Sequence, residues 1–282
     1  MSRIVYVNGE FVPEEEAKVS VFDRGFLFAD AVYEVTSVLR GRLIDNAAHL
    51  ARLARSLDEI GLESPLPVAD ITAIQQELVD RNRLDEGVIY LQVSRGAADR
   101  DFVFPEDAEP TLVMFTQVKE LENDPKARSG IRVISTPDIR WGRCDIKTTA
   151  LLAACLAKQA AIQAGVDDAW FVADGLVTEG SSNNAFILAP DGTLITRQLG
   201  SEILPGITRQ VVLALCDETN LRFEERPFSL DEAWAASEAF VTSASSFVYP
   251  VVAIDGKAIG DGRPGPVATR LRELYIAKAS AD

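Results

Sequence analysis

The sequence Asp138-Ile-Arg-Trp-Gly-Arg-Cys-Asp-Ile-Lys147 places five charged side chains within ten residues, just ahead of an alanine-rich apolar stretch at 150–164. A β-branched run at 131–135 precedes it, so the segment joins a predicted strand to a predicted helix. Burial and the two neighbouring arginines would favour the neutral amine of Lys147, the form that reacts with an aldehyde, whereas Asp145 would oppose this effect. Most lysines are solvated charges, so from this stretch alone both interpretations stay open.

Upstream of this stretch, the sequence predicts a sheet with two helices. Asn8-Gly9 separates two β-rich runs, which is typical of a tight hairpin over residues 4–12. A polar stretch at 119–130 has the composition of an interdomain connection. Further elements follow from β-branched content or from apolar residues at helical spacing: strands at 32–39, 88–94 and 111–118, and helices at 46–60 and 70–83. We therefore expect a small N-terminal α+β domain over residues 1–121.

Downstream, strand and helix patterns continue to alternate. Besides the strand at 131–135 and the helix at 150–164, they predict strands at 169–172, 185–188 and 239–242, and a helix at 208–218 opened after Pro205-Gly206. A chain of 282 residues suits two packed domains. We expect a mixed α+β fold with a larger C-terminal domain over residues 122–282.

The composition excludes several classes of function. A formal net charge of −15 opposes binding to nucleic acid and to anionic membranes. No apolar run approaches the roughly 20 residues that cross a bilayer, and the first residues read as a strand rather than a secretion signal. Three scattered cysteines and one histidine, His49, predict no metal site, disulfide framework or histidine-based triad. We expect a cytoplasmic protein whose proton transfer depends on another residue.

Three further segments have the residue types of a ligand site, although each has an ordinary structural explanation. Residues 177–184 gather hydroxyl and amide side chains around Glu179, as a ligand-facing loop or a solvated turn would. Residues 204–209 place a glycine and Thr208 at a helix start, which suits either a phosphate or simple capping. Residues 242–246 add hydroxyls after a buried strand, and Arg52 would add a positive charge.

Taken together and in order, these segments resemble the fold-type IV pyridoxal-phosphate enzymes over essentially the whole chain. That family contains the D-amino-acid and the branched-chain aminotransferases, and its fold pairs a small N-terminal domain with a larger domain built on a barrel-like sheet. The motifs that carry the resemblance are Asp23-Arg-Gly25, Phe28-Ala-Asp30, Val32-Tyr33-Glu34, His49-Leu-Ala-Arg52-Leu, Arg140-Trp-Gly-Arg-Cys-Asp-Ile-Lys147, Thr178-Glu-Gly-Ser-Ser-Asn183, Gly206-Ile-Thr-Arg209 and Phe240-Val-Thr-Ser243.

The resemblance implies a role for each matching residue. Lys147 would carry pyridoxal 5′-phosphate as a Schiff base and move the substrate α-proton, and Glu179 would pair with the ring nitrogen. The phosphate would be held by Arg52, Ile207, Thr208, Ser243 and Ala244, the last through its main chain because many relatives have a hydroxyl there. Asp23-Arg-Gly25 and His49 would be structural, with His49 orienting the helix of Arg52.

For the substrate, the resemblance is strongest to the D-amino-acid aminotransferases, which pass an amino group from a donor such as D-alanine to a 2-oxo acid such as 2-oxoglutarate. Tyr33 and Arg100 would bind the substrate carboxylate, with Arg100 serving the neighbouring subunit of at least a homodimer. Phe102 stands where that branch has a histidine, which removes one hydrogen-bond donor. A branched-chain L-amino-acid or R-selective amine transaminase therefore stays open, and an aminodeoxychorismate lyase is a further alternative that Arg100 disfavours.

Overall fold

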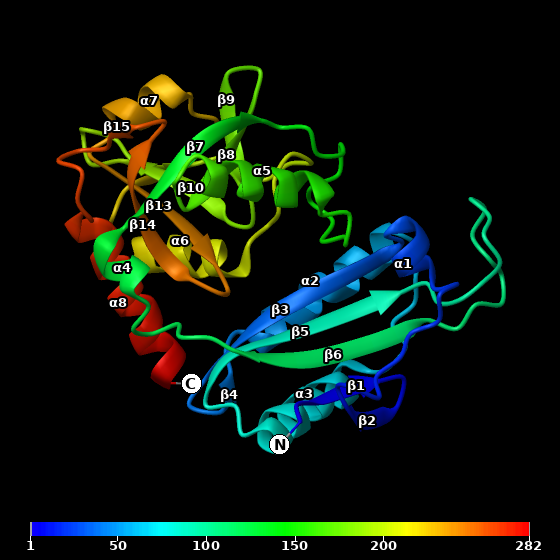
Figure 1. Cartoon of the computed structure of the whole chain (residues 1–282). Helices are drawn as coiled ribbons and strands as arrows, with labels where there is room; N and C mark the ends of the chain where they lie inside the picture. Colours follow the sequence, from blue (N-terminus) through cyan, green and yellow to red (C-terminus); the bar gives the residue numbers. More distant parts are fainter. Residues whose placement is uncertain (1, 282) are drawn as a thin grey trace. The chain divides into compact units, whose positions relative to one another are not determined.

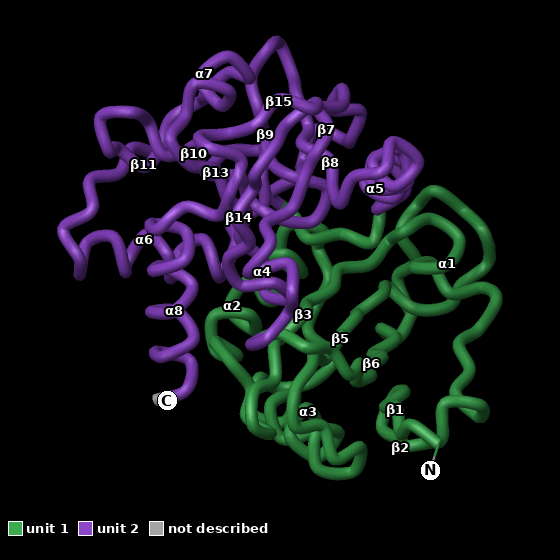
Figure 2. The backbone as a smooth tube through the Cα atoms, turned by 60° about the vertical axis from the view of Figure 1, so that its left-hand side comes forward, with its two compact units in different colours: residues 1–121, 146–150 green, residues 122–145, 151–282 purple. Residues whose placement is uncertain are grey.

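The computed structural model describes residues 2–281, which divide into two compact units (Figures 1 and 2). Unit 1 comprises residues 1–121 and 146–150, and unit 2 comprises residues 122–145 and 151–282. The short segment 146–150, which includes Lys147, thus packs with unit 1, whereas the expected boundaries assign it to the C-terminal domain.

Unit 1 is a six-stranded antiparallel sheet with the strand order β2-β1-β6-β5-β3-β4. Its described elements are β1 (Ile4–Val7), β2 (Glu10–Pro13), α1 (Arg24–Phe28), β3 (Ala31–Leu39), β4 (Arg42–Leu43), α2 (Asn46–Glu59), α3 (Val68–Asn82), β5 (Glu86–Ser94) and β6 (Thr111–Val118). The predicted hairpin, strands and helices of this region are confirmed, and their ends shift by one or two residues.

The core of unit 1 lies between its sheet and the two longer helices. Leu50, Leu53 and Leu57 recur at helical spacing along α2, and all three are buried against strand residues such as Val32 and Leu91. Ile146 belongs to the same cluster, so burial of its side chain helps to hold the segment that carries Lys147.

Unit 2 contains a nine-stranded mixed sheet with the order β12-β11-β10-β13-β14-β7-β8-β9, to which β15 adds beside β14. Its described elements are α4 (Pro125–Ser129), β7 (Ile131–Pro137), α5 (Leu152–Gln163), β8 (Asp168–Ala173), β9 (Leu176–Gly180), β10 (Asn184–Leu188), β11 (Leu194–Thr196), α6 (Ile207–Thr219), β12 (Phe223–Glu225), α7 (Leu230–Ala235), β13 (Glu238–Ser243), β14 (Phe247–Ile254), β15 (Lys257–Ala258) and α8 (Pro266–Ala281).

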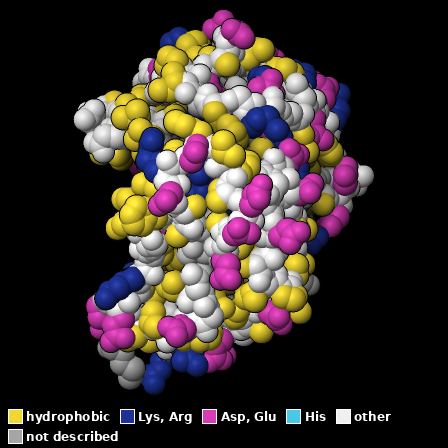
Figure 3. Space-filling model, turned by 90° about the vertical axis from the view of Figure 1, so that its right-hand side faces the viewer, with side chains coloured by type: hydrophobic (Ala, Val, Ile, Leu, Met, Phe, Trp, Pro, Cys, Tyr) yellow, Lys and Arg dark blue, Asp and Glu magenta, His cyan; other side chains and the backbone are white. Residues whose placement is uncertain are grey.

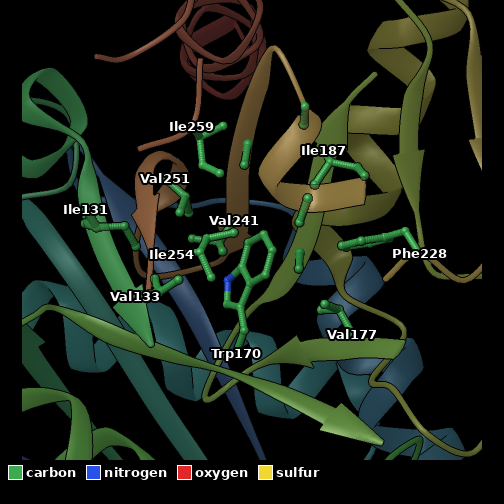
Figure 4. Close-up of a cluster of buried hydrophobic side chains, with 14 of the residues drawn as sticks. Ile131, Val133, Trp170, Val177, Ile187, Phe228, Val241, Val251, Ile254 and Ile259 are labelled. Carbon is green, nitrogen blue, oxygen red and sulfur yellow. The ribbon is translucent and has the colours of Figure 1, made fainter. Parts of the chain in front are cut away.

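The sheet of unit 2 curls into a half-barrel. Strand β9 is at one end of the strand order, yet it contacts β10 near the other end. The curled sheet packs on a cluster of fully buried side chains that includes Trp170 of β8, Ile254 of β14 and Phe228 from the segment before α7, and Figure 4 shows these side chains gathered in one core. Helix α5 packs on β8, whereas α8 packs on β14 and α6 on β13. The expected mixed fold with a barrel-like sheet is confirmed.

Two segments that the sequence indicates as irregular, at 119–130 and 177–184, contain helix or strand residues. The predicted connection at 119–130 contains the helix α4, because the Asp124 carboxylate caps the amide of Lys126 and Pro125 takes the first helical turn. Most of the predicted loop at 177–184 belongs to strand β9, which pairs with β8, and Asn184 is the first residue of β10. Thr178 and Glu179 are buried, which rules out a solvated turn at these positions.

The surface and the helix lengths are consistent with a charged globular chain. On the face drawn in Figure 3, acidic side chains are spread among hydrophobic and neutral ones, and the whole sequence has a net charge of −15. Within residues 2–281, no helix has the length and apolar character that crossing a bilayer requires.

Candidate active site

In unit 1, the segment 146–150 runs beside β3. The amide of Tyr33 donates to the carbonyl of Lys147 at 3.0 Å, and the amide of Thr149 donates to the carbonyl of Ala31 at 3.1 Å. Val32 and Thr148 form an isolated antiparallel bridge between these bonds. Backbone pairing therefore fixes the position of Lys147, whose side chain is half-buried.

Tyr33 is the predicted site residue that lies next to Lys147. The Lys147 Nζ atom lies over the Tyr33 ring, 4.3 Å from its centre, which is the geometry of a cation–π contact. Tyr33 in turn stacks on Tyr90, and Tyr90 stacks on Phe115, with ring centres 5.4 and 4.8 Å apart. The three rings form a stacked row on β3, β5 and β6, and of these Tyr33 contacts Lys147.

Arg52 makes a two-point ion pair with Glu34. Its Nε and one terminal nitrogen each lie 2.7 Å from a carboxylate oxygen of Glu34, and His49 Nδ1 lies 2.8 Å from the same carboxylate. Burial opposes ionisation of Glu34, but the charge and hydrogen bonds of Arg52 and the contact with His49 outweigh it, so the pKa of Glu34 falls to about 2. Arg52 is thus oriented by a buried carboxylate that the sequence interpretation did not assign to the site.

In unit 2, Glu179 lies on β9 and is held from both sides. Its Oε1 accepts from Arg140 Nη1 at 2.5 Å, and its Oε2 accepts from Asn184 Nδ2 at 2.9 Å and from the amide of Leu204 at 3.1 Å. Arg140 is itself fixed by Asp138, which binds two of its nitrogens. The buried negative charge of Glu179 is therefore balanced and immobile.

Asn184 connects Glu179 with the start of α6. Its side-chain nitrogen also donates to the carbonyl of Leu204 at 2.9 Å. A Cβ atom on Gly206 would lie only 2.0 Å from Asn184 Oδ1, so glycine is required for the close approach at this helix start. Asn184 also pairs in register with Thr242 of β13. One asparagine thus joins β9, β13 and the N-terminus of α6.

The predicted phosphate residues of unit 2 fall around this N-terminus. Ile207 and Thr208 are the first two residues of α6, a 13-residue helix whose leading amides have no partner within the helix. The hydroxyls of Thr208 and Thr242 are buried and have no hydrogen-bond partner in the described structure. Ser243, next to Thr242, shares a hydrogen bond with Ser246 at 2.7 Å. Unpaired buried donors at a helix N-terminus fit a phosphate group.

The two arginines that were expected to depress the basicity of Lys147 are both neutralised. Arg140 pairs with Asp138 and Glu179, and Arg143 pairs with Asp145 at 2.9 Å. Each cation therefore has its carboxylate within unit 2. Glu179 is distant in sequence from Arg140, which it binds, whereas Asp138 and Asp145 each lie close in sequence to the arginine that they bind.

Arg100 lies on the exposed loop between β5 and β6 in unit 1. Its guanidinium carbon is 5.1 Å from the ring centre of Phe28 and 5.6 Å from that of Phe102. Phe102, at the position where a histidine is expected, is 78% exposed. The loop thus presents a cation between two aromatic rings.

Sequence comparison identifies the class to which this fold and site belong. A family model described as amino-transferase class IV matches residues 31–254, and the chain belongs to that family. It is 39% identical over 272 residues to a D-alanine aminotransferase of Staphylococcus aureus (strain MSSA476), with 96% of each chain covered. It is 38% identical over 269 residues to a D-alanine aminotransferase of Bacillus licheniformis, covering 95% of this chain and 94% of the relative.

Solved structures of related enzymes have the same fold. A branched-chain amino acid aminotransferase from T.th., solved with pyridoxamine 5′-phosphate, superposes with a TM-score of 0.90 at 26% identity, covering 100% of this chain and 95% of that chain. A branched-chain aminotransferase from Thermoproteus uzoniensis gives a TM-score of 0.89 at 25% identity, covering 100% and 96%. The chain is an aminotransferase of fold type IV.

Proposed function

We propose that this aminotransferase uses pyridoxal 5′-phosphate to transfer the amino group of a D-amino acid, such as D-alanine, to a 2-oxo acid, such as 2-oxoglutarate. The observation that carries the proposal is the buried polar network of unit 2, in which Asn184 binds the Glu179 carboxylate and the carbonyl of Leu204 ahead of α6, and pairs with Thr242 of β13. The hydroxyls of Thr242 and of Thr208, at the start of α6, are buried and unpartnered. The identity of 38–39% to D-alanine aminotransferases over nearly the whole chain supports the D-amino acid as substrate.

Different residues of the chain would bind different parts of this cofactor. Lys147 would hold its aldehyde carbon covalently, and Glu179 would accept from the ring nitrogen. The phosphate would be bound by the Arg52 guanidinium, the α6 amides, and the loop of Ser243 and Ala244. When bound, pyridoxal phosphate supplies a carbon that takes up the amino group and a ring that accepts the electron pair released at the substrate α-carbon.

Lys147 would then act as the base that takes the α-proton. Its backbone is pinned by β3, so its amine is presented without the entropy cost of ordering a mobile segment. The Tyr33 ring below the amine stabilises the ammonium that forms when the proton arrives.

For the substrate carboxylate, Tyr33 and Arg100 are the proposed contacts. The guanidinium of Arg100 offers a planar pair of donors that matches a carboxylate. Arg100 would serve the site of a neighbouring copy, so we propose at least a homodimer, working in the cytoplasm.

A second candidate function is supported by Phe102. Because phenylalanine removes a donor from the carboxylate-binding loop, the site would favour less polar donors, as a branched-chain L-amino-acid or R-selective amine transaminase does. The structural likeness to branched-chain aminotransferases fits this alternative. The two candidates differ in donor chirality and in dependence on a donor carboxylate.

The test compares D-alanine, L-leucine and an R-configured arylalkyl amine as donors to 2-oxoglutarate, using purified protein supplied with pyridoxal phosphate. We expect D-alanine to give pyruvate, and we expect Lys147→Ala to lose the near-visible absorbance of the bound cofactor and at least about 10³-fold in kcat. Lys158→Ala, an exposed lysine of α5, is the matched control. No turnover of any D-amino acid would refute the first candidate, and faster turnover of L-leucine would support the second.

A further inference from the structure

The loop between β5 and β6, residues 95–110, has little regular structure of its own, although it carries Arg100. Loops of this length in a compact fold are uncommon and usually functional. Phe102, Val103 and Phe104, at the tip of the loop, are all exposed, so burial of their side chains within this chain does not hold the tip in place.

The base of the loop is held by the segment that precedes α1. The amide of Arg24 donates to the carbonyl of Gly96 at 2.9 Å, and Asp23 forms a β-bridge with Ala97. Gly96 has a φ of +95°, and a Cβ atom there would lie 1.9 Å from the carbonyl oxygen of Glu109. The main chain at Gly96, near the start of the loop, therefore lies against the main chain at Glu109, near its end, and only glycine fits at this contact. The contact holds the two ends of the loop together.

The tip of the loop is held by the side chain of Arg24, which is only 3% exposed. One terminal nitrogen of its guanidinium donates to the carbonyl of Asp101 at 2.6 Å and approaches that of Val103 at 3.4 Å. Its Nε donates to Asp30 at 2.7 Å, and Arg95 donates to the same carboxylate oxygen at 2.8 Å. The buried Arg24 side chain thus binds the main chain at the residues on either side of Phe102.

Between Arg24 and Arg100, arginine and phenylalanine side chains contact one another in turn. The guanidinium carbon of Arg24 lies 4.7 Å from the Phe28 ring centre and 5.6 Å from that of Phe104, and Phe104 also covers Arg95 at 3.7 Å. The Arg100 guanidinium also lies over the Phe28 ring, 5.1 Å from its centre, and the rings of Phe28 and Phe102 are 5.6 Å apart. Arg24 and Arg100 share one ring, so displacing Arg24 releases the support under Arg100.

We propose that Arg24 is a positioning residue for substrate binding, which orients Arg100 through the Phe28 ring and through the Asp101 and Val103 carbonyls. This inference rests on the proposed function, because it takes Arg100 as the contact for the substrate carboxylate. It gives the Asp23-Arg-Gly25 motif a role in recognition, where the sequence indicated only a structural one. It also gives Phe102 a function, since its ring packs beside Arg100 instead of donating a hydrogen bond.

The test uses Arg24→Lys in the holoenzyme. Lysine keeps the positive charge, but it has no planar group to stack on the two rings, and its single nitrogen cannot take the places of both Nε at Asp30 and the terminal nitrogen at the Asp101 and Val103 carbonyls. We expect amide hydrogen exchange of residues 97–109 to accelerate roughly tenfold, the KM for 2-oxoglutarate to rise by a similar factor, and kcat to stay within about threefold of wild type. The absorbance of the bound cofactor should stay unchanged, because Lys147 and Glu179 are untouched.

Two further variants make the outcome decisive. Arg81→Lys is the matched control, since Arg81 also stacks on a ring, Phe11 at 4.4 Å, and pairs with Glu77, but on α3; it should leave the loop and KM unchanged. Phe104→Leu changes an exposed side chain and should reproduce the loop effect if Arg24→Lys fails to fold. Loop exchange unaltered in both test variants, or a loosened loop with an unchanged KM, would overturn the inference. A wild-type protein that accepts no 2-oxo acid would instead refute the proposed function.

Discussion

Glu34 is the residue on which the geometry around Arg52 depends. Changing Glu34→Gln leaves a buried guanidinium without its counter-charge, so we expect the free energy of unfolding at pH 7 to fall by roughly 3–5 kcal/mol. The carboxyl has a pKa of about 2 when folded, below its ordinary value of 4.5. Its contribution is therefore complete above about pH 4.5 and is lost as the pH falls towards 2.

Denaturant unfolding between pH 7 and pH 3 measures this effect. The stability gap between wild type and Glu34→Gln should be constant near neutrality and should narrow below about pH 4.5. Glu77→Gln, which breaks the exposed pair with Arg81, is the control and should cost no more than about 0.5 kcal/mol. An equal loss in the two variants, or a gap that widens in acid, would contradict this account.

At the same scale, the sequence identified reactive groups better than their partners. Lys147 and Glu179 stand out through their motifs, and both occupy defined positions in their units. The sequence marks Arg140 only as a neighbour of Lys147, Glu34 only as part of the Val32-Tyr33-Glu34 motif, and Asn184 only as the last residue of the segment 177–184. Their roles depend on contacts between residues 5 to 39 positions apart along the chain, which local sequence patterns do not encode.

At the scale of elements, the start of α6 depends on Gly206. Its φ of −64° suits any residue, so the requirement for glycine is steric: a Cβ would collide with Asn184 Oδ1. Gly206→Ala should push Asn184 away from Glu179 and Leu204, and this should weaken pyridoxal phosphate binding about 10- to 100-fold. Titration of apoprotein with the cofactor, followed by absorbance, measures the change.

Gly142→Ala is the control for this prediction, because a Cβ atom at Gly142 meets nothing within 4 Å. It should bind the cofactor as the wild type does. If Gly206→Ala also retained wild-type affinity, Asn184 would not couple the carboxylate of Glu179 to the helix start.

Elements with a strong local period were predictable, and elements defined by pairing were not. The spacing of the leucines in α2 predicts a helix, and the β-branched run of β6 predicts a strand, and the structure has both. Strand β9 has glycine and hydroxyl-rich residues around its end, which is typical of a turn, and only pairing with β8 makes it a strand. No element was assigned beyond residue 242, where β14 and α8 complete the half-barrel and its helical cover.

At the scale of the whole molecule, the chain passes between its two units three times, after residues 121, 145 and 150. The first crossing follows a change in composition that the sequence reveals. The other two isolate the five residues around Lys147, whose membership of unit 1 depends on backbone bonds to Ala31 and Tyr33, more than 110 positions away. Local sequence patterns therefore do not predict that the chain returns to unit 1 at residues 146–150.

The proposed homodimer makes a prediction that depends on which copy each residue serves. Lys147→Ala and Arg100→Ala should each be almost inactive towards D-alanine when alone. If Arg100 serves the neighbouring copy, a dimer with one chain of each variant contains one site with both residues intact. Unfolding and refolding an equal mixture should then restore roughly a quarter of the wild-type activity, because half of the dimers are mixed and each has one complete site. A mixture that stays inactive, although light scattering shows dimers, would mean that Arg100 serves its own chain or that the substrate carboxylate is bound elsewhere.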